Sequence, residues 1–440
     1  MKCLLIINQC NPEWASVPLV GYNFFDGISR GADVTLVTHI RNRTALEKVR
    51  NGRKIVYIPE SARVQAYYRL VSRFLNRGNV NWPVAHALTY PVYAEFNRRV
   101  YREFGAEVSE GRYDVVHALT PILPRYPVKI VEACEGTPFI LGPVNGGVPF
   151  PKAFSKEARQ EFAHFNPLRI FSRLIPGYAK TYKNAAKVLA GSTYTHTMIR
   201  DMFGLDPSRI ELFFENGIPA SFFSTGKASS PQDGSFELLF VGRLVPYKGA
   251  DMLIEALSGL EGDIKEHIRL TIVGDGPEKD HLIALAGRLG MARLVRFTGW
   301  VPQTETASYY RSSDLFCFPS IREFGGAVVL EAMASGLPSI VVNNGGIGEY
   351  ITDETGFRID PASRSRLISG MKEKIGLLFH DRSLHHRMSQ AAAKRAGMFE
   401  WGVKSGRILD IYRRVIQEKA QAPASGDKLS PAEPPKGKAG

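Results

Sequence analysis

The feature that most constrains the fold is a repeated alternation of short apolar runs with longer amphipathic stretches. The apolar runs are 3–8, 33–39, 54–59, 114–119, 138–144 and 187–192 in the first half of the chain, and 236–242, 268–274, 295–300, 314–320 and 338–344 in the second. Continuous Val, Ile and Leu runs separated by helical patterns are typical of parallel strands that are buried on both faces. The sequence therefore predicts an α/β chain with two successive doubly wound, Rossmann-like sheets.

The chain of 440 residues divides at a Ser-, Gly- and Pro-rich segment, STGKASSPQDGS (224–235). We expect an N-terminal domain over 1–216, a linker over 217–235 and a second domain over 236–400. A helix at 401–420 is expected to pack back toward the N-terminal domain, and the Pro-, Gly- and Lys-rich tail at 421–440 is expected to be disordered. Open α/β sheets bind ligands at the carboxyl ends of their strands, so the cleft between the two sheets is the expected site.

Positive charge is concentrated in the first half of the chain. Residues 1–216 hold 28 Lys and Arg against 18 Asp and Glu, whereas residues 217–440 hold 28 against 25, within a formal net charge of +13. The stretches 62–79 and 152–187 are basic and amphipathic, which fits either an anionic membrane surface or solvated helix faces over a core. No DNA- or RNA-binding motif accompanies the charge, so no nucleic acid partner is expected.

Cysteine usage and hydropathy indicate where the protein works. The four cysteines, Cys3, Cys10, Cys134 and Cys317, are far apart in the sequence, which is typical of reduced cytosolic thiols. No stretch approaches 18 apolar residues, so no spanning helix is expected. The expected localisation is cytoplasmic, with peripheral attachment to the inner face of the cell membrane.

The loops after the first two strands of the second domain carry candidate ligand-binding residues. Gly242 ends the first of these strands, Arg243 follows it, and Lys248 lies five residues further on, where a helix is expected to begin. Two cations beside a helix N-terminus form a site for a diphosphate, although two solvated surface cations would explain the pattern equally well. Gly274 and Gly276 permit close backbone approach to a ligand, or simply a tight turn.

The segment 320–351 is the most specific part of the sequence. Glu323 and Glu331 are separated by seven residues, and Gly325 and Gly326 between them allow a tight turn before a helix. Carboxylates at such positions accept hydrogen bonds well from the vicinal hydroxyls of sugars. Taken alone, the two glutamates are also explained as a capping carboxylate and an ordinary helix residue.

These motifs occur in one order: R-x4-K, GDGP, F-x-G-x-V (297–301), E-x7-E and GGIGE. Together they resemble the family 4 retaining glycosyltransferases, the glycosyl transferases group 1, which have the GT-B fold. The resemblance extends over about residues 236–360.

The resemblance implies a role for each matching residue. Arg243 and Lys248 would bind the donor diphosphate and stabilise the leaving group, Glu331 would bind the ribose, and Glu323 would face the transferred sugar. Further donor-binding positions implied by the match are Gly242, Gly274, Gly276, Trp300, Val301, Phe324, Gly325 and Gly326. Trp300 and Val301 fall where the family holds the nucleotide base.

The N-terminal half matches the family less closely. The loop after the first strand (9–23) contains only Gly21, where many relatives have two glycines, and the family's His-x-His is reduced to His117 with Leu119. His117 is a candidate catalytic residue or a strand-end core residue. The segment LGPVNGGVPFP (141–151) contains the candidate acceptor or cleft loop, Asn145, Gly146 and Gly147, or an ordinary β-turn.

The expected function is transfer of a sugar from a nucleotide-diphosphate sugar to a hydroxyl of a glycan or lipid-linked acceptor in surface polysaccharide synthesis. The resemblance implies retention of anomeric configuration and no metal or other cofactor, and the sequence contains no Asp-x-Asp. Two alternatives remain open: a nucleotide-sugar epimerase or sugar-phosphate synthase on the same fold, and a non-catalytic membrane- or nucleic-acid-binding protein with a relic donor site.

Overall fold

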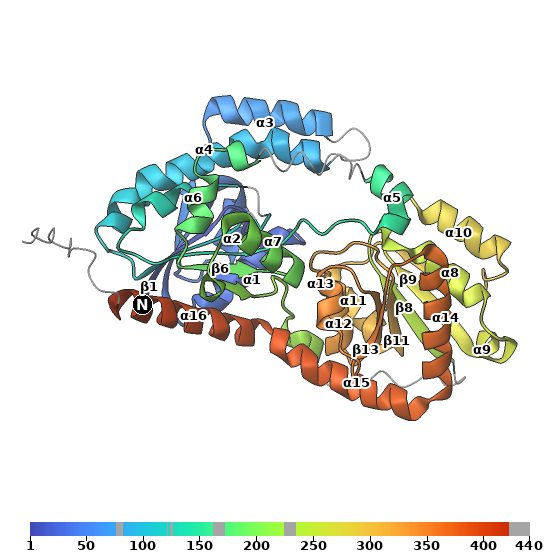
Figure 1. Cartoon of the computed structure of the whole chain (residues 1–440). Coiled ribbons are helices and arrows are strands. Elements are labelled where there is room, and N and C mark those ends of the chain that lie inside the picture. The colour runs from blue at the N-terminus through green and yellow to red at the C-terminus, as the bar shows by residue number, and fades with distance from the viewer. Residues whose placement is uncertain (76–81, 121, 124–125, 162–171, 224–234, 422–440) are drawn as a thin grey trace, which may run out of the picture.

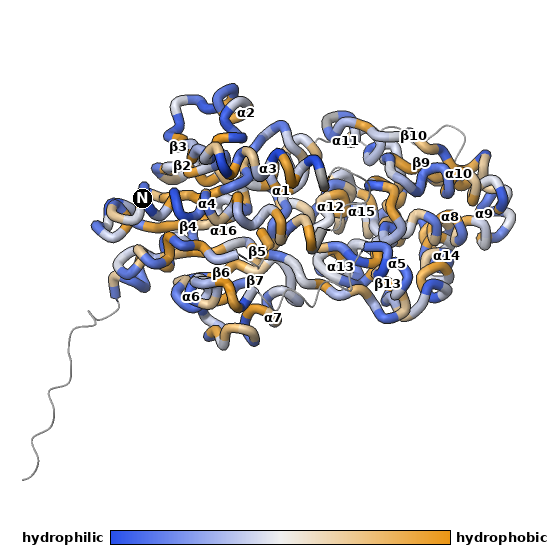
Figure 2. Tube along the Cα trace, turned by 90° about the horizontal axis from the view of Figure 1, so that it is seen from above, coloured by the Kyte–Doolittle hydropathy of each residue, from blue (hydrophilic) through white to orange (hydrophobic). Residues whose placement is uncertain are grey.

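The computed structural model describes residues 1–75, 82–120, 122–123, 126–161, 172–223 and 235–421. It contains two parallel sheets, one in each half of the chain, at opposite ends of an elongated molecule (Figures 1 and 2). Most of the expected linker and tail (224–234 and 422–440) lies outside the described residues, as do 76–79 and 162–171 of the two basic stretches.

The N-terminal sheet has the strand order β3-β2-β1-β4-β5-β6-β7, and every neighbouring pair is parallel. Its strands are β1 (Lys2–Ile7), β2 (Asp33–His39), β3 (Lys54–Ile58), β4 (Val115–Thr120), β5 (Phe139–Val144), β6 (Lys187–Ala190) and β7 (Ile210–Leu212). The central strands β1, β4, β5 and β6 are almost wholly buried, because helices cover both faces.

The C-terminal sheet has the order β10-β9-β8-β11-β12-β13 and is also parallel. Its strands are β8 (Phe236–Val241), β9 (Ile268–Val273), β10 (Val295–Gly299), β11 (Leu315–Phe318), β12 (Ser339–Val342) and β13 (Gly356–Ile359). The predicted fold class, two doubly wound Rossmann-like sheets, is confirmed. In each sheet the order of the strands reverses beside the first strand, between β1 and β4 or between β8 and β11. Folds of this kind bind ligands at that point.

Helices connect the strands on both faces (Figure 1). In the first half they are α1 (Val17–Ile28), α2 (Arg43–Lys48), α3 (Ala62–Leu75), α4 (Trp82–Ser109), α5 (Ser155–Gln160), α6 (Tyr178–Lys183) and α7 (Thr193–Phe203). In the second half they are α8 (Ala250–Ser258), α9 (Gly262–His267), α10 (Lys279–Arg288), α11 (Gln303–Arg311), α12 (Ala327–Ala334), α13 (Gly346–Tyr350), α14 (Arg364–His380), α15 (Arg382–Ala396) and α16 (Trp401–Gln421). No helix among the described residues is long and apolar enough to cross a membrane.

Two of the four edge strands, β7 and β13, were not predicted. Each has only three or four residues, and each carries a charged residue, Glu211 or Arg358, that is partly or fully exposed. Short edge strands with charged residues avoid pairing with other chains, and for the same reason they lack the apolar signal of a buried strand.

The chain crosses between the two halves in both directions. Helix α16 returns to the N-terminal domain, where Ile408, Leu409 and Tyr412 share a hydrophobic core with Leu5 of β1. In the other direction, Phe154 comes from the N-terminal half of the sequence but is buried in the core of the C-terminal domain. Residues 145–161 are therefore called the strap, because they run from β5 across to the C-terminal domain.

Candidate functional site

Three charged residues predicted to bind the donor lie in loops that follow strands at the carboxyl end of the C-terminal sheet, and two of them are in contact. Lys248 Nζ donates a hydrogen bond to Glu323 Oε2, and these two side chains are only 12% and 17% exposed. Arg243, at the end of β8, is exposed. Lys248 closes a 3-10 turn (Pro246–Lys248) rather than opening helix α8, which begins at Ala250.

Glycines shape the loops that carry these charges. Gly274 and Gly276 have φ of +142° and +158°, and a Cβ on them would lie 1.9 Å from the Gly242 carbonyl oxygen and 2.3 Å from the Leu244 carbonyl oxygen. Both glycines are thus explained by close packing between the loops after β8 and β9. This contact holds the chain around Gly242 and Arg243 in place, since Leu244 N–H also donates to the Asp275 carbonyl.

Glu323 and Glu331 lie on either side of the start of α12. Glu323 is in the preceding loop, and Gly326 (φ +53°) is the residue before the first helical residue. Glu331 is 6% exposed, and its carboxylate accepts hydrogen bonds from Gln303 Nε2 (3.0 Å) and the Tyr310 hydroxyl (2.9 Å). Burial raises the pKa of Glu331, and these two hydrogen bonds oppose that rise.

The residues expected at the nucleotide base lie at the end of β10. Trp300 is 73% exposed, whereas Val301 is partly buried against the C-terminal core. An aromatic ring that is left this open has a free face for a planar ligand.

The strap lies over the loops of the C-terminal domain. Arg322 Nε donates to the Val148 carbonyl (2.7 Å) and Asn344 Nδ2 donates to the Pro149 carbonyl (3.2 Å). The rings of Phe150 and Tyr247 pack edge to face with centroids 6.4 Å apart. Residues from both domains therefore form the surroundings of Lys248 and Glu323.

The strap also brings a carboxylate of the N-terminal half toward the cations. Burial raises the pKa of Glu161, while the positive charges of Arg243, Arg322 and Lys248 lower it. Glu161 thus lies in the electrostatic field of the two cations that were predicted to bind a diphosphate. A second interdomain contact lies nearby, where Thr193 donates to Glu349 through its N–H (3.0 Å) and its hydroxyl (2.9 Å).

The predicted cleft loop lies at the boundary of the two domains. Asn145 is 2% exposed, and its Nδ2 donates to the carbonyl of Phe324 (3.1 Å), the residue next to Glu323. Gly146 and Gly147 have φ of +150° and +88°. The structure thus brings Asn145, Gly146 and Gly147 beside the Glu323–Gly326 loop.

Two other residues of the N-terminal half lie away from these charges. His117 is fully buried, with Nδ1 2.6 Å from the Tyr412 hydroxyl and Nε2 2.6 Å from the Gly142 carbonyl oxygen. Burial lowers the pKa of His117 to about 4, so the ring is neutral at pH 7. The geometry supports the alternative of a strand-end core residue rather than a catalytic histidine.

Gly21 lies in helix α1 and not in the loop that was predicted over 9–23, which ends where the helix begins at Val17. A Cβ on Gly21 would lie 2.4 Å from the Gln9 carbonyl oxygen and 2.8 Å from Ile7 Cγ2. Gly21 therefore allows α1 to pack closely on the end of β1, and this prediction of a loop position is wrong.

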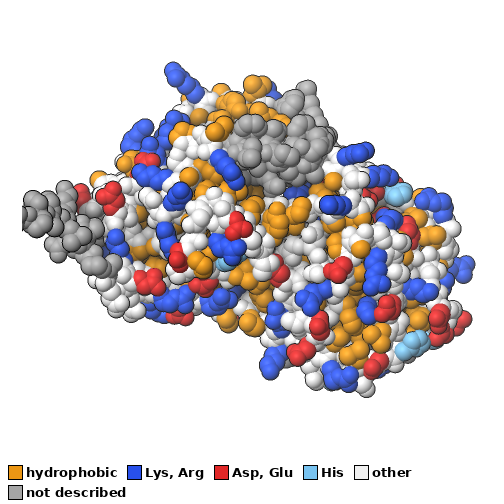
Figure 3. Space-filling view, viewed as in Figure 1, with side chains coloured by type: hydrophobic (Ala, Val, Ile, Leu, Met, Phe, Trp, Pro, Cys, Tyr) orange, Lys and Arg blue, Asp and Glu red, His pale blue; other side chains and the backbone are white. Residues whose placement is uncertain are grey.

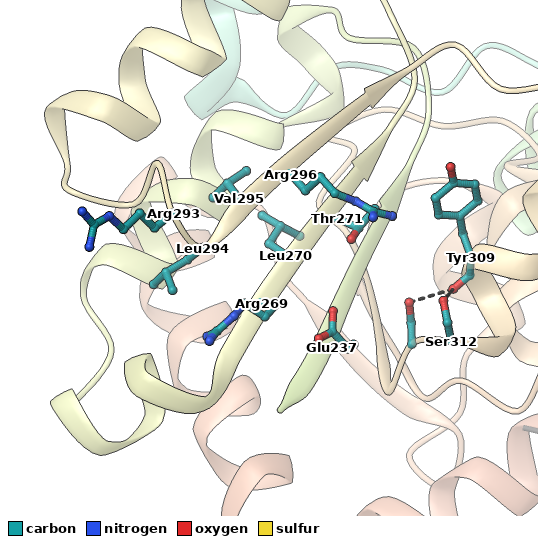
Figure 4. A pocket seen from close by; sticks show the side chains of 11 residues that line it. Glu237, Arg269, Leu270, Thr271, Arg293, Leu294, Val295, Arg296, Tyr309 and Ser312 are labelled. Carbon is teal, nitrogen blue, oxygen red and sulfur yellow. Dashed lines mark hydrogen bonds between the residues drawn. The ribbon is translucent and has the colours of Figure 1, made fainter. Parts of the chain in front are cut away.

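A separate cavity of about 550 Å³ lies at the other end of the C-terminal sheet (Figure 4). Its lining comes from the amino ends of β8, β9 and β10 and from α11, and includes Glu237, Arg269, Arg293, Arg296 and Tyr309. None of the predicted site residues lines it. Among the described residues, no group of three or more His, Cys, Asp or Glu side chains is placed to hold a metal ion.

Two facing Rossmann-like domains with a charged site between them define the GT-B fold, and solved structures agree. The lipopolysaccharide outer core galactosyltransferase WaaB aligns with 94% of this chain and 100% of its own, at 14% identity and a TM-score of 0.64. Anabaena Alr3699/HepE, solved in complex with UDP, aligns with 94% of this chain and 100% of its own, at 17% identity and a TM-score of 0.61.

Residues 224–395 match the family described as glycosyl transferases group 1. A D-inositol 3-phosphate glycosyltransferase 2 of Catenulispora acidiphila is 29% identical over 257 residues, which are 53% of this chain and 57% of the relative. The chain thus spans only about half the length of the curated relatives it matches. The resemblance seen in the sequence motifs is confirmed.

Several residues around the site were not predicted from the sequence. Arg322 is next to Glu323 in the most specific motif and could have been found there. Glu215 and Glu161 carry no local signal, because each comes near the site only through the packing of segments that are distant in the sequence, and the same holds for Lys404, whose charge acts on Glu215.

Proposed function

We propose that the protein is a glycosyltransferase that moves a sugar from a nucleotide-diphosphate sugar to an acceptor hydroxyl, with retention of anomeric configuration. The observation that carries this proposal is the ion pair of Lys248 and Glu323 at the carboxyl end of the C-terminal sheet, beside the strap, with Arg243 following β8 at the same end of the sheet. The family match of residues 224–395 supports the same reaction.

In the proposed reaction, the bond between the anomeric carbon and the diphosphate oxygen breaks, and the acceptor oxygen bonds to that carbon on the same face. The departing phosphate oxygen takes the acceptor proton. Arg243 and Lys248 stabilise the negative charge that develops on the diphosphate, and Glu323 orients the sugar. The reaction is proposed to need no metal ion or other cofactor, so EDTA is expected to leave the turnover rate unchanged.

The acceptor is proposed to be a glycan or a lipid-linked sugar of surface or exopolysaccharide synthesis. The exposed side of α3 supports a membrane-facing N-terminal domain, because Arg63, Arg69 and Arg73 are exposed beside Leu70, which is 68% exposed. Figure 3 shows Lys and Arg side chains around apolar ones at the top of the molecule, over α3 and α4. A cytoplasmic protein held at the anionic inner face of the membrane fits this surface.

Thermal unfolding with UDP-, GDP- and ADP-sugars tests the donor site, because a ligand that binds only the folded state stabilises it. Inositol 3-phosphate belongs in the acceptor panel, since the relatives' names specify it. We expect one nucleotide class to raise the melting temperature of the wild type and not that of Arg243→Ala. Stabilisation by none of the nucleotides would favour the non-catalytic alternative.

A further inference from the structure

A buried polar cluster joins the two domains next to the proposed sugar site. Its members are Asn145 from the strap, Glu215 from the segment that follows β7, and Lys404 from α16, and they are 2%, 6% and 3% exposed. Charged side chains are rarely buried to this extent unless they are paired or hydrogen-bonded.

Asn145 is held in one orientation by its partners. Its Oδ1 accepts from the hydroxyls of Ser192 (3.0 Å) and Thr195 (2.9 Å), so its amide nitrogen must point the other way. That Nδ2 lies 2.9 Å from both carboxylate oxygens of Glu215 and 3.1 Å from the Phe324 carbonyl oxygen. One amide group therefore connects Glu215 to the loop that carries Glu323.

Glu215 also packs directly on this loop. A Cβ on Gly325 would lie 2.3 Å from Glu215 Oε1 and 2.2 Å from Asn216 Nδ2, so a side chain at position 325 would displace these polar groups. The backbone of Phe324 and Gly325 is thus fixed from the N-terminal side, while Lys248 holds Glu323 from the C-terminal side.

Lys404 is the cation that interacts electrostatically with the Glu215 carboxylate, without a direct hydrogen bond between them among the described contacts. Lys404 Nζ donates to the Phe214 carbonyl and lies 4.3 Å from the ring centroid of Phe213. Burial raises the pKa of Glu215 to about 7, and the hydrogen bond from Asn145 and the charge of Lys404 oppose that rise. Burial likewise lowers the pKa of Lys404 to about 7, and the charge of Glu215 opposes that fall.

The Glu215 backbone N–H also favours the ionised carboxylate, and the other side chains that act on Glu215 come from the C-terminal domain. The negative charge of Glu323, in the loop after β11, disfavours ionisation of Glu215. Tyr350 of α13 is close to Glu215 as well. Burial raises the pKa of the Tyr350 hydroxyl, and the negative charge of Glu215 raises it further.

We propose that Asn145 and Glu215 are positioning residues that hold the Glu323–Gly326 loop for the transferred sugar, and that the charge of Lys404 favours the ionised form of Glu215. This inference rests on the proposed glycosyltransferase function. The ionised carboxylate accepts both contacts from the Asn145 amide, whereas a protonated one presents an O–H to a donor and loses part of that contact. The loop should therefore be held most firmly above the pH at which Glu215 ionises.

The test compares the wild type with Glu215→Gln, Lys404→Met and the matched surface control Glu103→Gln. Nucleotide-sugar affinity is measured by calorimetry, and kcat is measured between pH 6 and 9, with UDP-glucose, GDP-mannose or ADP-glucose, whichever stabilises the wild type. Circular dichroism and thermal unfolding identify any variant that does not fold. If the wild type binds none of these nucleotide sugars, the proposed glycosyltransferase function is contradicted, and this inference with it.

We expect Glu215→Gln to bind the donor within about twofold of the wild type but to lose about 10- to 100-fold in kcat, the range expected for a misplaced reactive group. The decrease of kcat that we expect in the wild type below about pH 7 should be absent from the pH profile of Glu215→Gln. Lys404→Met should move that decrease to higher pH, because the ionised carboxylate loses its cation. The inference is overturned if both folded variants keep the wild-type kcat and the wild-type pH profile.

Discussion

The two domains contribute to the candidate site in different ways. The C-terminal domain supplies Arg243, Lys248, Glu323 and Glu331 from two short segments, each of which follows a strand at the carboxyl end of the sheet. The N-terminal side contributes through packing, with Asn145 contacting the Phe324 carbonyl. A chemical site made of local motifs can therefore be identified from sequence, whereas the support that positions it depends on contacts between distant segments.

The largest effect on activity is expected from removal of the most exposed cation of the donor site. Arg243→Ala should lower kcat by about 100- to 1,000-fold, because a preorganised charge on the leaving group is lost. Its removal leaves no buried charge unpaired, so the melting temperature should be close to that of the wild type. Steady-state kinetics measures the effect, with Arg293→Ala as the control on the same domain.

The proposed membrane face of the N-terminal domain is tested by charge reversal. Each Lys or Arg near an anionic surface contributes about 1 kcal/mol, so Arg69→Glu with Arg73→Glu should weaken vesicle binding by at least about tenfold. Sedimentation with phosphatidylserine vesicles in rising salt measures this. Reversal of Arg293 and Arg387 on the C-terminal domain is the matched control, and equal losses in both double variants would contradict a specific face.

The role of Glu331 separates donor binding from chemistry. Glu331→Gln keeps the shape of the side chain but removes the charge that would accept hydrogen bonds from the ribose, so the donor KM should rise about tenfold. The control Glu305→Gln, at an exposed position of α11, should leave KM unchanged. A normal donor KM in Glu331→Gln would show that the carboxylate serves Gln303 and Tyr310 only.

The smallest effect on activity is expected at His117. His117→Ala should keep kcat within about twofold but destabilise the fold by about 2 kcal/mol, because two buried hydrogen-bonding groups lose their partner. The folded-state pKa of about 4 lies below the unfolded value, so the stability contributed by neutral His117 is present above about pH 6.5 and is lost toward pH 4. Denaturant unfolding at pH 5 and 8 should show this loss of unfolding free energy in the wild type and not in His117→Ala. A large fall in kcat in His117→Ala would instead support a catalytic role for the histidine.

Much of the fold could be predicted because buried parallel strands have a strong apolar signal. All the central strands were found in this way, and β7 and β13 were missed because they are short, charged and at the edge of a sheet. The position of Gly21 was mistaken because its loop sequence, with Pro and Ser before it, does not show where helix α1 begins.

The candidate site was predictable where side chains are close in sequence and not elsewhere. Nothing in the neighbourhood of Glu215 indicates that it packs on Gly325, and nothing near Lys404 indicates that α16 places it beside Phe213. Similarly, Phe154 lies in a basic amphipathic stretch, although the fold buries it in the core of the other domain. Such contacts depend on the packing of the two domains together.

Proton NMR of a nucleotide sugar during incubation with the wild-type enzyme and the acceptor panel tests the central claim most directly. We expect release of the nucleoside diphosphate and a new anomeric signal with the configuration of the donor, both lost in Arg243→Ala. An unchanged donor would contradict it, and so would an epimerised nucleotide sugar that forms without release of the diphosphate.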